Sequence, residues 1–215
     1  MSIRVDRISY GRHPSDGENY IIQHGGQTMK KNIQKPVITP LPVLMIATYC
    51  ENGTADLMNA AWGGQCGPKH IALNLGNHVT TENIKRTKAF TVSFADKKNL
   101  VASDYVGLVS AKDEKNKLEK AGLHAVKSEN VDAPVIEEYP LTLECKAVSI
   151  REEMGEIRVV GEIVNTLADE DIIGEDGKVD IGKIGVLVYD SPAHFYRVVG
   201  EKAGDAFKDG LALKK

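Results

Sequence analysis

The pattern of apolar and polar positions is clearest between residues 73 and 95. Leucines alternate with other residues at positions 73 and 75, which predicts a strand because successive side chains point to opposite faces. A polar elbow follows at residues 76–80, then a short amphipathic helix, and Phe90, Val92 and Phe94 alternate again. The stretch therefore predicts strand, loop, short helix and strand, with the elbow at the start of the helix.

Most of the remaining chain shows short apolar runs of the same kind. A run at residues 42–50 leads to Asn52-Gly53, a strong hairpin signal, and a second strand follows at residues 55–62. The glycine-containing stretch at residues 63–68 is expected to break the chain. Further expected elements are helices within 96–110 and 113–122, a loop at 134–140, and strands at 141–150, 157–167 and 186–189. Strands joined by hairpins, with a few short helices, predict a mainly β fold (α+β), a closed or nearly closed antiparallel barrel.

The N-terminal part of the chain lacks this periodicity. Residues 1–28 are polar and dotted with glycine, and a more ordinary segment begins at Met29. We expect an N-terminal extension or arm over residues 1–39 and one barrel domain over residues 40–215. The leader is either an upstream extension, part of it foreign to the fold, or an arm that packs across a partner, and both interpretations stay open.

Composition excludes several classes of function. The 215 residues carry a net charge of −3 with both signs interspersed, so the basic surface that nucleic acid requires is missing. Three cysteines without a CxxC pair favour reduced thiols in the cytoplasm. No apolar run approaches the roughly 20 residues of a membrane span, and the N-terminus lacks a signal pattern.

A bound metal is not expected. The acidic stretch at residues 168–180 resembles a calcium loop only at its start, because Ile173 occupies position five and Asp180 position twelve. The six histidines show no HxH or HExxH spacing.

The polar elbow is the strongest candidate for chemistry. Gly76, Asn77, His78, Thr80 and Thr81 crowd the expected helix N-terminus, where free N–H groups and the helix dipole favour an anion such as phosphate. The alternative is that Thr80 or Thr81 is an ordinary N-cap of a surface helix. Both interpretations are compatible with the sequence.

Several segments together carry a resemblance. They are PVLMIAT, NAAW, TTENI, AFTVSFA, SDYVGLVSAKDEKNKLEKAGL, APVIEEYPLTLEC and VVGEIV, in that order along the chain. In order and spacing they resemble the flavin reductase-like, FMN-binding split-barrel family, and its flavoredoxin branch in particular. The resemblance covers roughly Pro40 to Phe207 and implies a homodimer of antiparallel split β-barrels with FMN near the dimer interface.

The resemblance also implies a set of cofactor-binding residues. Those expected along the flavin ring are Asn59, Ala60, Ala61 and Trp62. Those expected at the phosphate are His78, Thr80 and Thr81, with Asn83 and Lys85 as supports. Those expected beside the ribityl chain or ring are Ser93, Phe94 and Ala95, and Ser103 and Tyr105 are expected near the flavin or its phosphate. No catalytic side chain is expected, because FMN carries the chemistry.

Three functions follow, in order of preference. The first is an FMN-dependent oxidoreductase that passes hydride or electrons through bound FMN, with NAD(P)H as a candidate donor. The second is a non-catalytic FMN-binding electron-transfer protein acting between protein partners. It is favoured by Gly155-Glu156-Ile157, which stands where many nicotinamide-using relatives carry Gly-Asp-His. The third is a barrel without a cofactor, acting as a dimeric binding or structural module.

Overall fold

The computed structural model describes residues 21–22 and 30–214, so most of the leader at residues 1–28 lies outside the described residues. The chain divides into two units, Met1–Val37 and Ile38–Lys215. In the first unit, β1 (Ile21–Ile22) pairs antiparallel with β2 (Lys30–Lys31). The predicted boundary after residue 39 falls just inside the second unit.

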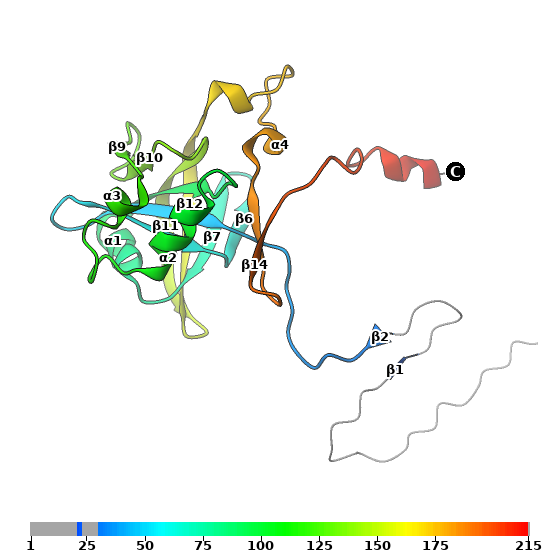
Figure 1. The fold of residues 1–215 in the computed structure, drawn as a ribbon, viewed down its shortest axis with the longest axis horizontal. Helices are drawn as coiled ribbons and strands as arrows, with labels where there is room; N and C mark the ends of the chain where they lie inside the picture. The colour runs from blue at the N-terminus through cyan, green and yellow to red at the C-terminus, as the bar shows by residue number, and fades with distance from the viewer. Residues whose placement is uncertain (1–20, 23–29, 215) are drawn as a thin grey trace, which may run out of the picture. The chain divides into compact units, whose positions relative to one another are not determined.

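A seven-stranded antiparallel sheet forms the second unit (Figure 1). Its strand order is β5-β4-β8-β11-β12-β7-β6. The strands are β4 (Leu44–Tyr49), β5 (Ala55–Ala60), β6 (Gly63–Gly67), β7 (His70–Leu75), β8 (Ala89–Phe94), β11 (Leu141–Glu153) and β12 (Glu156–Ala168). The expected mainly β fold with short helices is confirmed.

Smaller elements complete the unit. A three-stranded sheet joins β3 (Leu41–Pro42), β13 (Leu187–Asp190) and β14 (Phe195–Val198), and β9 (Ala125–Lys127) pairs with β10 (Pro134–Ile136). The helices are α1 (Val79–Thr87), α2 (Leu100–Leu108), α3 (Lys117–Ala121) and α4 (Ile181–Ile184), with 3₁₀ turns η1 (Glu170–Ile172) and η2 (Asp209–Leu213). No helix of the described residues is long and apolar enough to cross a membrane.

Two sequence predictions are wrong. The stretch at residues 63–68 does not break the chain, because Gly63–Gly67 is an edge strand paired with β7. A side chain at Gly63 would lie 2.6 Å from Leu73 and 2.9 Å from Leu44, so close packing, not a turn, requires this glycine. The segment predicted as a loop at 134–140 contains the strand β10, which pairs with β9. Proline is tolerated at the first position of a strand, and Pro134 occupies that position.

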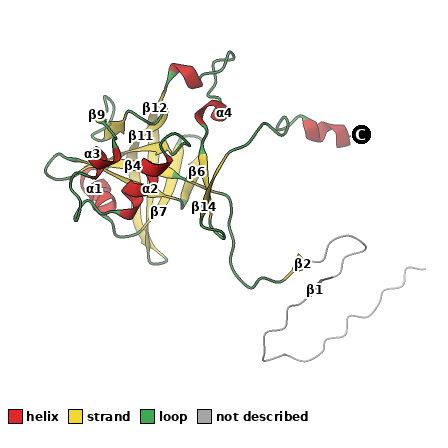
Figure 2. Ribbon diagram, viewed as in Figure 1, coloured by secondary structure: helices red, strands yellow, loops and turns green. Residues whose placement is uncertain are grey.

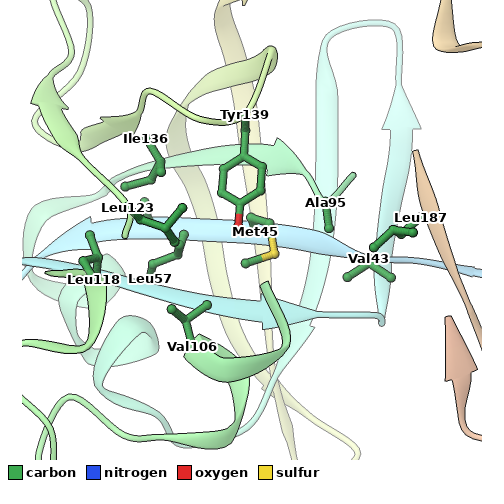
Figure 3. Packing of buried hydrophobic residues seen from close by; sticks show 11 residues of the cluster. Val43, Met45, Leu57, Ala95, Val106, Leu118, Leu123, Ile136, Tyr139 and Leu187 are labelled. Carbon is green, nitrogen blue, oxygen red and sulfur yellow. The ribbon is translucent and has the colours of Figure 1, made fainter. Parts of the chain in front are cut away.

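The continuous apolar run at residues 43–47 reflects a strand that is buried on both faces. Leu44 and Ile46 face a cluster inside the barrel with Phe90. Val43 and Met45 face a second cluster beneath the helices, which Figure 3 shows with Leu57, Val106 and Tyr139 around β4. A strand covered on both sides has no polar face, and this explains the absence of alternation.

Helices α1, α2 and α3 gather near the same end of the sheet (Figures 1 and 2), where α1 adds Ile84 to the cluster inside the barrel and α2 and α3 add Val106 and Leu118 to the second cluster. The first packs on β4 and β5, and the other two pack on β5 and on each other. Each is short, and burial of one face against the sheet stabilises it more than helix propensity does. The loops at the ends of these helices are thereby brought together above β5.

A buried carboxylate holds the loop after β9 against β11. Glu144 is almost fully buried and accepts hydrogen bonds from Asn130 Nδ2 at 2.8 Å, from Asn165 Nδ2 at 2.6 Å and from the Ser128 hydroxyl. Burial alone would raise its pKa, but these hydrogen bonds lower the pKa below its ordinary value of 4.5. The charged form of Glu144 therefore stabilises the folded chain.

We expect a stability contribution from Glu144 that depends on pH. Because its folded pKa is depressed, the contribution is present at neutral pH and is lost as the pH falls below 4.5 through the folded pKa. The variant Glu144→Gln should lower the free energy of unfolding at pH 7 and flatten its decline between about pH 5 and about pH 3. Urea unfolding of both proteins across this pH range measures the free energy of unfolding. If it falls with pH equally in the variant and in the unsubstituted protein, Glu144 makes no such contribution.

Candidate functional site

Helix α1 begins with backbone donors that have no partner in the described chain. His78 is its N-cap, with an extended backbone at φ −111° and ψ 164°. Its carbonyl accepts from Glu82 N at 3.1 Å. The N–H groups of Val79, Thr80 and Thr81 have no acceptor among the described residues. These three donors and the helix dipole make the start of α1 electropositive.

The threonine side chains point into the protein. The Thr80 hydroxyl donates to Asp56 Oδ2 at 2.6 Å, and the Thr81 hydroxyl donates to the Gly76 carbonyl at 2.8 Å. Neither threonine is the N-cap, so the capping alternative is wrong. Asn83 is also buried and donates to the Thr48 hydroxyl at 3.0 Å. The Thr80 hydroxyl and the Asn83 amide hold α1 on β5 and β4, and the Thr81 hydroxyl joins α1 to the preceding loop.

A buried ion pair lies directly below the start of α1. Lys117 Nζ, from the first residue of α3, is 2.7 Å from Asp56 Oδ1 on β5, and the two side chains are 4% and 1% exposed. Asp56 also accepts from Thr80, so one carboxylate joins β5, α1 and α3. No sequence argument pointed to Lys117, because it stands in a lysine-rich stretch that is typical of a solvated surface.

The ion pair and the start of α1 border one cleft of about 390 Å³. Its walls come from β5, the start of α1, and the segment from the end of α2 to α3. They are formed by Asp56, Met58, Asn59, His78, Val79, Thr80, Val106, Gly107, Leu108, Val109, Ser110, Ala111 and Lys117. The cleft thus combines a cation, free N–H groups and apolar side chains, a set of groups suited to an anion with an apolar body.

Close contacts fix α2 at the edge of this cleft. Asn59 Nδ2 donates to the Ser103 carbonyl at 3.2 Å, and a side chain at Gly107 would lie only 2.3 Å from the Asn59 amide. The Ser103 hydroxyl lies 2.8 Å from the Tyr139 hydroxyl. The Tyr196 hydroxyl donates to Asp104 Oδ1 at 2.8 Å. Burial raises the pKa of Tyr139 and of Tyr196 to about 12, so both hydroxyls stay protonated.

The predicted site residues divide into two groups. Asn59, His78 and Thr80 meet at the cleft. The others lie elsewhere. Ser93 and Ala95 are buried in the sheet, with the Ser93 hydroxyl 2.8 Å from that of Thr142. Lys85 forms a surface ion pair with Glu82, and Trp62 is 58% exposed. The remaining predicted residues are half-buried: Ala60, Ala61, Phe94 and Tyr105.

Two larger clefts lie toward the other end of α1 and share Lys88. One, of about 600 Å³, is bordered by the loop at residues 127–132. The other, of about 590 Å³, is bordered by Lys85, Arg151 and the turn at Gly155. The first lies beside Ser128 and Asn130, whose donors are already used by the buried Glu144 carboxylate, and neither is lined by the first residues of α1 or by a buried cation. We therefore place the candidate site at the smaller cleft, where the chemistry is concentrated.

Comparison with known proteins decides the family. The model of the flavin reductase like domain matches residues 38–194. The chain belongs to the flavin reductase-like family. No match was found among curated proteins. Within the described residues, no group of three or more metal-ligating side chains comes together.

Solved structures of this family resemble the chain closely. Flavoredoxin of Desulfovibrio vulgaris (Miyazaki F) matches with a TM-score of 0.80 and 32% identity, over 85% of this chain and 100% of that one. Flavoredoxin from Methanosarcina acetivorans matches with a TM-score of 0.77 and 29% identity, over 87% and 100%. An FMN-binding domain of a flavin reductases-like enzyme from Shewanella baltica OS155 shares the fold at 20% identity, with a TM-score of 0.64 over 76% and 88%. The flavin reductase-like chain thus falls in the flavoredoxin branch.

The ion pair predicts a large effect of removing one charge only. Lys117→Met should lower the free energy of unfolding by about 3–5 kcal/mol, because it leaves the Asp56 carboxylate buried without its cation. The double variant Asp56→Asn with Lys117→Met should recover much of the loss. Urea unfolding at pH 7 measures both.

The matched control is Lys120→Met on the same helix. Lys120 is an exposed lysine that pairs with Glu114 on the surface, and such pairs contribute little. It should unfold at nearly the same urea concentration as the unsubstituted protein. Equal midpoints for Lys117→Met and Lys120→Met would show that the buried pair does not stabilise the fold.

Proposed function

We propose that the protein is an FMN-dependent oxidoreductase with the FMN phosphate at the start of α1. The observation that carries this proposal is the meeting of the free N–H groups of Val79 and Thr80 with the buried Lys117 ammonium, which is paired with Asp56, at one cleft. A phosphate dianion matches this set, because helix N-termini and ammonium groups both favour it. His78 at the same border would add a third kind of donor when protonated.

The ring of the flavin would extend from this anchor along the end of β5. Asn59 lines the cleft, and Ala60 and Ala61 follow as small residues that let a flat ring approach the backbone. Trp62 comes next and is 58% exposed, so its ring is open to contact with a ligand. The similarity to two flavoredoxins and to an FMN-binding domain supports this assignment.

The chain's own residues would bind and orient the flavin. Bound FMN supplies hydride and electron transfer, which no acid–base pair of the protein has to perform. The backbone of α1 and Lys117 would hold the phosphate, and α2, fixed by Asn59 and Gly107, would close one side of the cleft. We further propose a homodimer in the cytoplasm, in keeping with three free cysteines.

One observation favours a second candidate, an electron-transfer protein that acts between protein partners. The chain has Gly155-Glu156-Ile157 where the family resemblance implies Gly-Asp-His in members that use a nicotinamide. Met154 and Gly155 form a tight turn between β11 and β12, with φ values of 53° and 81°. This turn presents no histidine to a nicotinamide.

A proline at the first position of α1 tests the phosphate anchor. Val79→Pro removes one free N–H, and the extended His78 before it suits a residue that precedes proline. The loss of one charge-assisted hydrogen bond should weaken FMN binding by about 10- to 100-fold. Fluorescence titration with FMN measures the affinity.

Riboflavin is the matched ligand and thermal unfolding the matched control. Because riboflavin lacks the phosphate, its affinity should be the same for Val79→Pro and for the unsubstituted protein. The melting temperature should change little, since proline is favoured at the first position of a helix. An unchanged affinity for FMN would place the phosphate elsewhere.

Anaerobic reduction separates the two candidate functions. We expect NADH or NADPH to bleach the visible flavin bands of the FMN-loaded protein, because an oxidoreductase of this kind takes hydride from a nicotinamide. Dithionite is the control that shows the bound flavin to be reducible. Bleaching by dithionite but by neither nicotinamide would favour the electron-transfer protein.

A further inference from the structure

The C-terminal segment, residues 200–214, carries large apolar side chains that the rest of the described chain leaves uncovered. Phe207 is 99% exposed, Leu213 is 88% exposed and Leu211 is 58% exposed. All three lie in or next to η2 (Asp209–Leu213). Single exposed apolar residues are common, but three within seven positions form a patch.

The C-terminal segment is bonded only to itself. The last hydrogen bond to the barrel is from Val199 N to the Val186 carbonyl at 2.9 Å. Beyond it, the backbone bonds of the described residues join positions within the segment, as from Leu211 N to the Lys208 carbonyl at 2.9 Å. A 3₁₀ turn of five residues has little stability alone in water, so its order requires a surface that covers its apolar side.

A complementary surface is exposed on α2. Val101 and Leu108 are 79% and 76% exposed, and their spacing of seven residues places them on one face, two turns apart. The opposite face of α2 is buried through Ser103 and Val106. Leu108 also borders the cleft at Asn59 and His78. A cover on this face of α2 would therefore also shield the cleft from water.

We propose that the C-terminal segment of one copy packs its apolar side on the exposed face of α2 of a second copy. A linker of small and charged residues, 200–206, separates β14 from Phe207 and gives the segment the reach to leave its own barrel. In a two-fold symmetric dimer each copy packs its C-terminal segment on α2 of the other. Both segments are then covered, and no further copy can be added.

The area supports a second copy as the partner. Covering one phenylalanine and two leucines removes about 400 Å² of surface from water, and the surface beneath loses about as much. Two reciprocal contacts therefore bury about 1,600 Å² in total, the size of a standard stable interface. If the C-terminal segment packed on α2 of its own copy instead, this contact would bury no surface between the two copies. The inference does not depend on flavin binding.

Sedimentation velocity on the full chain tests the exchange. The segment variant Phe207→Ser, Leu211→Ser, Leu213→Ser should raise the dimer dissociation constant by about 100-fold. The control Lys202→Ser, Lys208→Ser, Lys214→Ser in the same segment should leave it unchanged. Circular dichroism checks that both proteins fold, which is expected because every substituted side chain is exposed.

Mixing two variants distinguishes exchange from packing within one copy. The helix variant Val101→Gln, Leu108→Gln should dissociate as readily as the segment variant. An equimolar mixture of the two should associate more tightly than either alone, by about tenfold or more, because only the mixed dimer keeps one intact contact. An unchanged dissociation constant in the segment variant, or a mixture no tighter than its components, would overturn the proposal.

Discussion

The buried ion pair between Asp56 and Lys117 is the interaction on which the candidate site depends. Each charge would be strongly destabilising alone in the interior, and their contact at 2.7 Å makes both tolerable. Since Asp56 also accepts from Thr80, the pair sets the start of α1 against β5 and α3. The arrangement leaves an ammonium group and free N–H donors beside the same cleft, and it does so with side chains that the fold itself requires.

The sheet supplies the rigid frame for this arrangement. β4 is covered on one face by the barrel interior and on the other by the cluster under the helices. Helices of nine residues or fewer stay in place because this second cluster includes Val106 of α2 and Leu118 of α3. Position and orientation at the cleft are thus a consequence of packing between sheet and helices, as is usual for sites built on short elements.

Much of the fold could be predicted because its signals are local. The Asn52-Gly53 turn, the continuous run of β4 and the elbow before α1 each depend on neighbouring residues, and the structure has each element. The glycine-rich β6 was missed because Gly63 serves close contacts with Leu44 and Leu73 from other strands. The short β10 was missed because prolines at both ends suggested a loop.

The candidate site was only partly predictable. The elbow could be recognised as a candidate anion site from its position, but the sequence does not say which way the Thr80 and Thr81 hydroxyls point. Helix packing turns both inward, and the start of α1 borders the cleft at Val79 and Thr80. Lys117 was missed because its partner lies on a distant strand, although a lone Asp56 inside the apolar β5 was a signal that a buried cation was needed.

The central claim is that the protein holds FMN by its phosphate. Isothermal titration of the unsubstituted protein with FMN and with riboflavin compares two ligands that differ only in that group. Because several charge-assisted hydrogen bonds converge on the phosphate, the account predicts an affinity for FMN at least about 100-fold higher than for riboflavin. Equal affinities, or no binding of FMN, would contradict it.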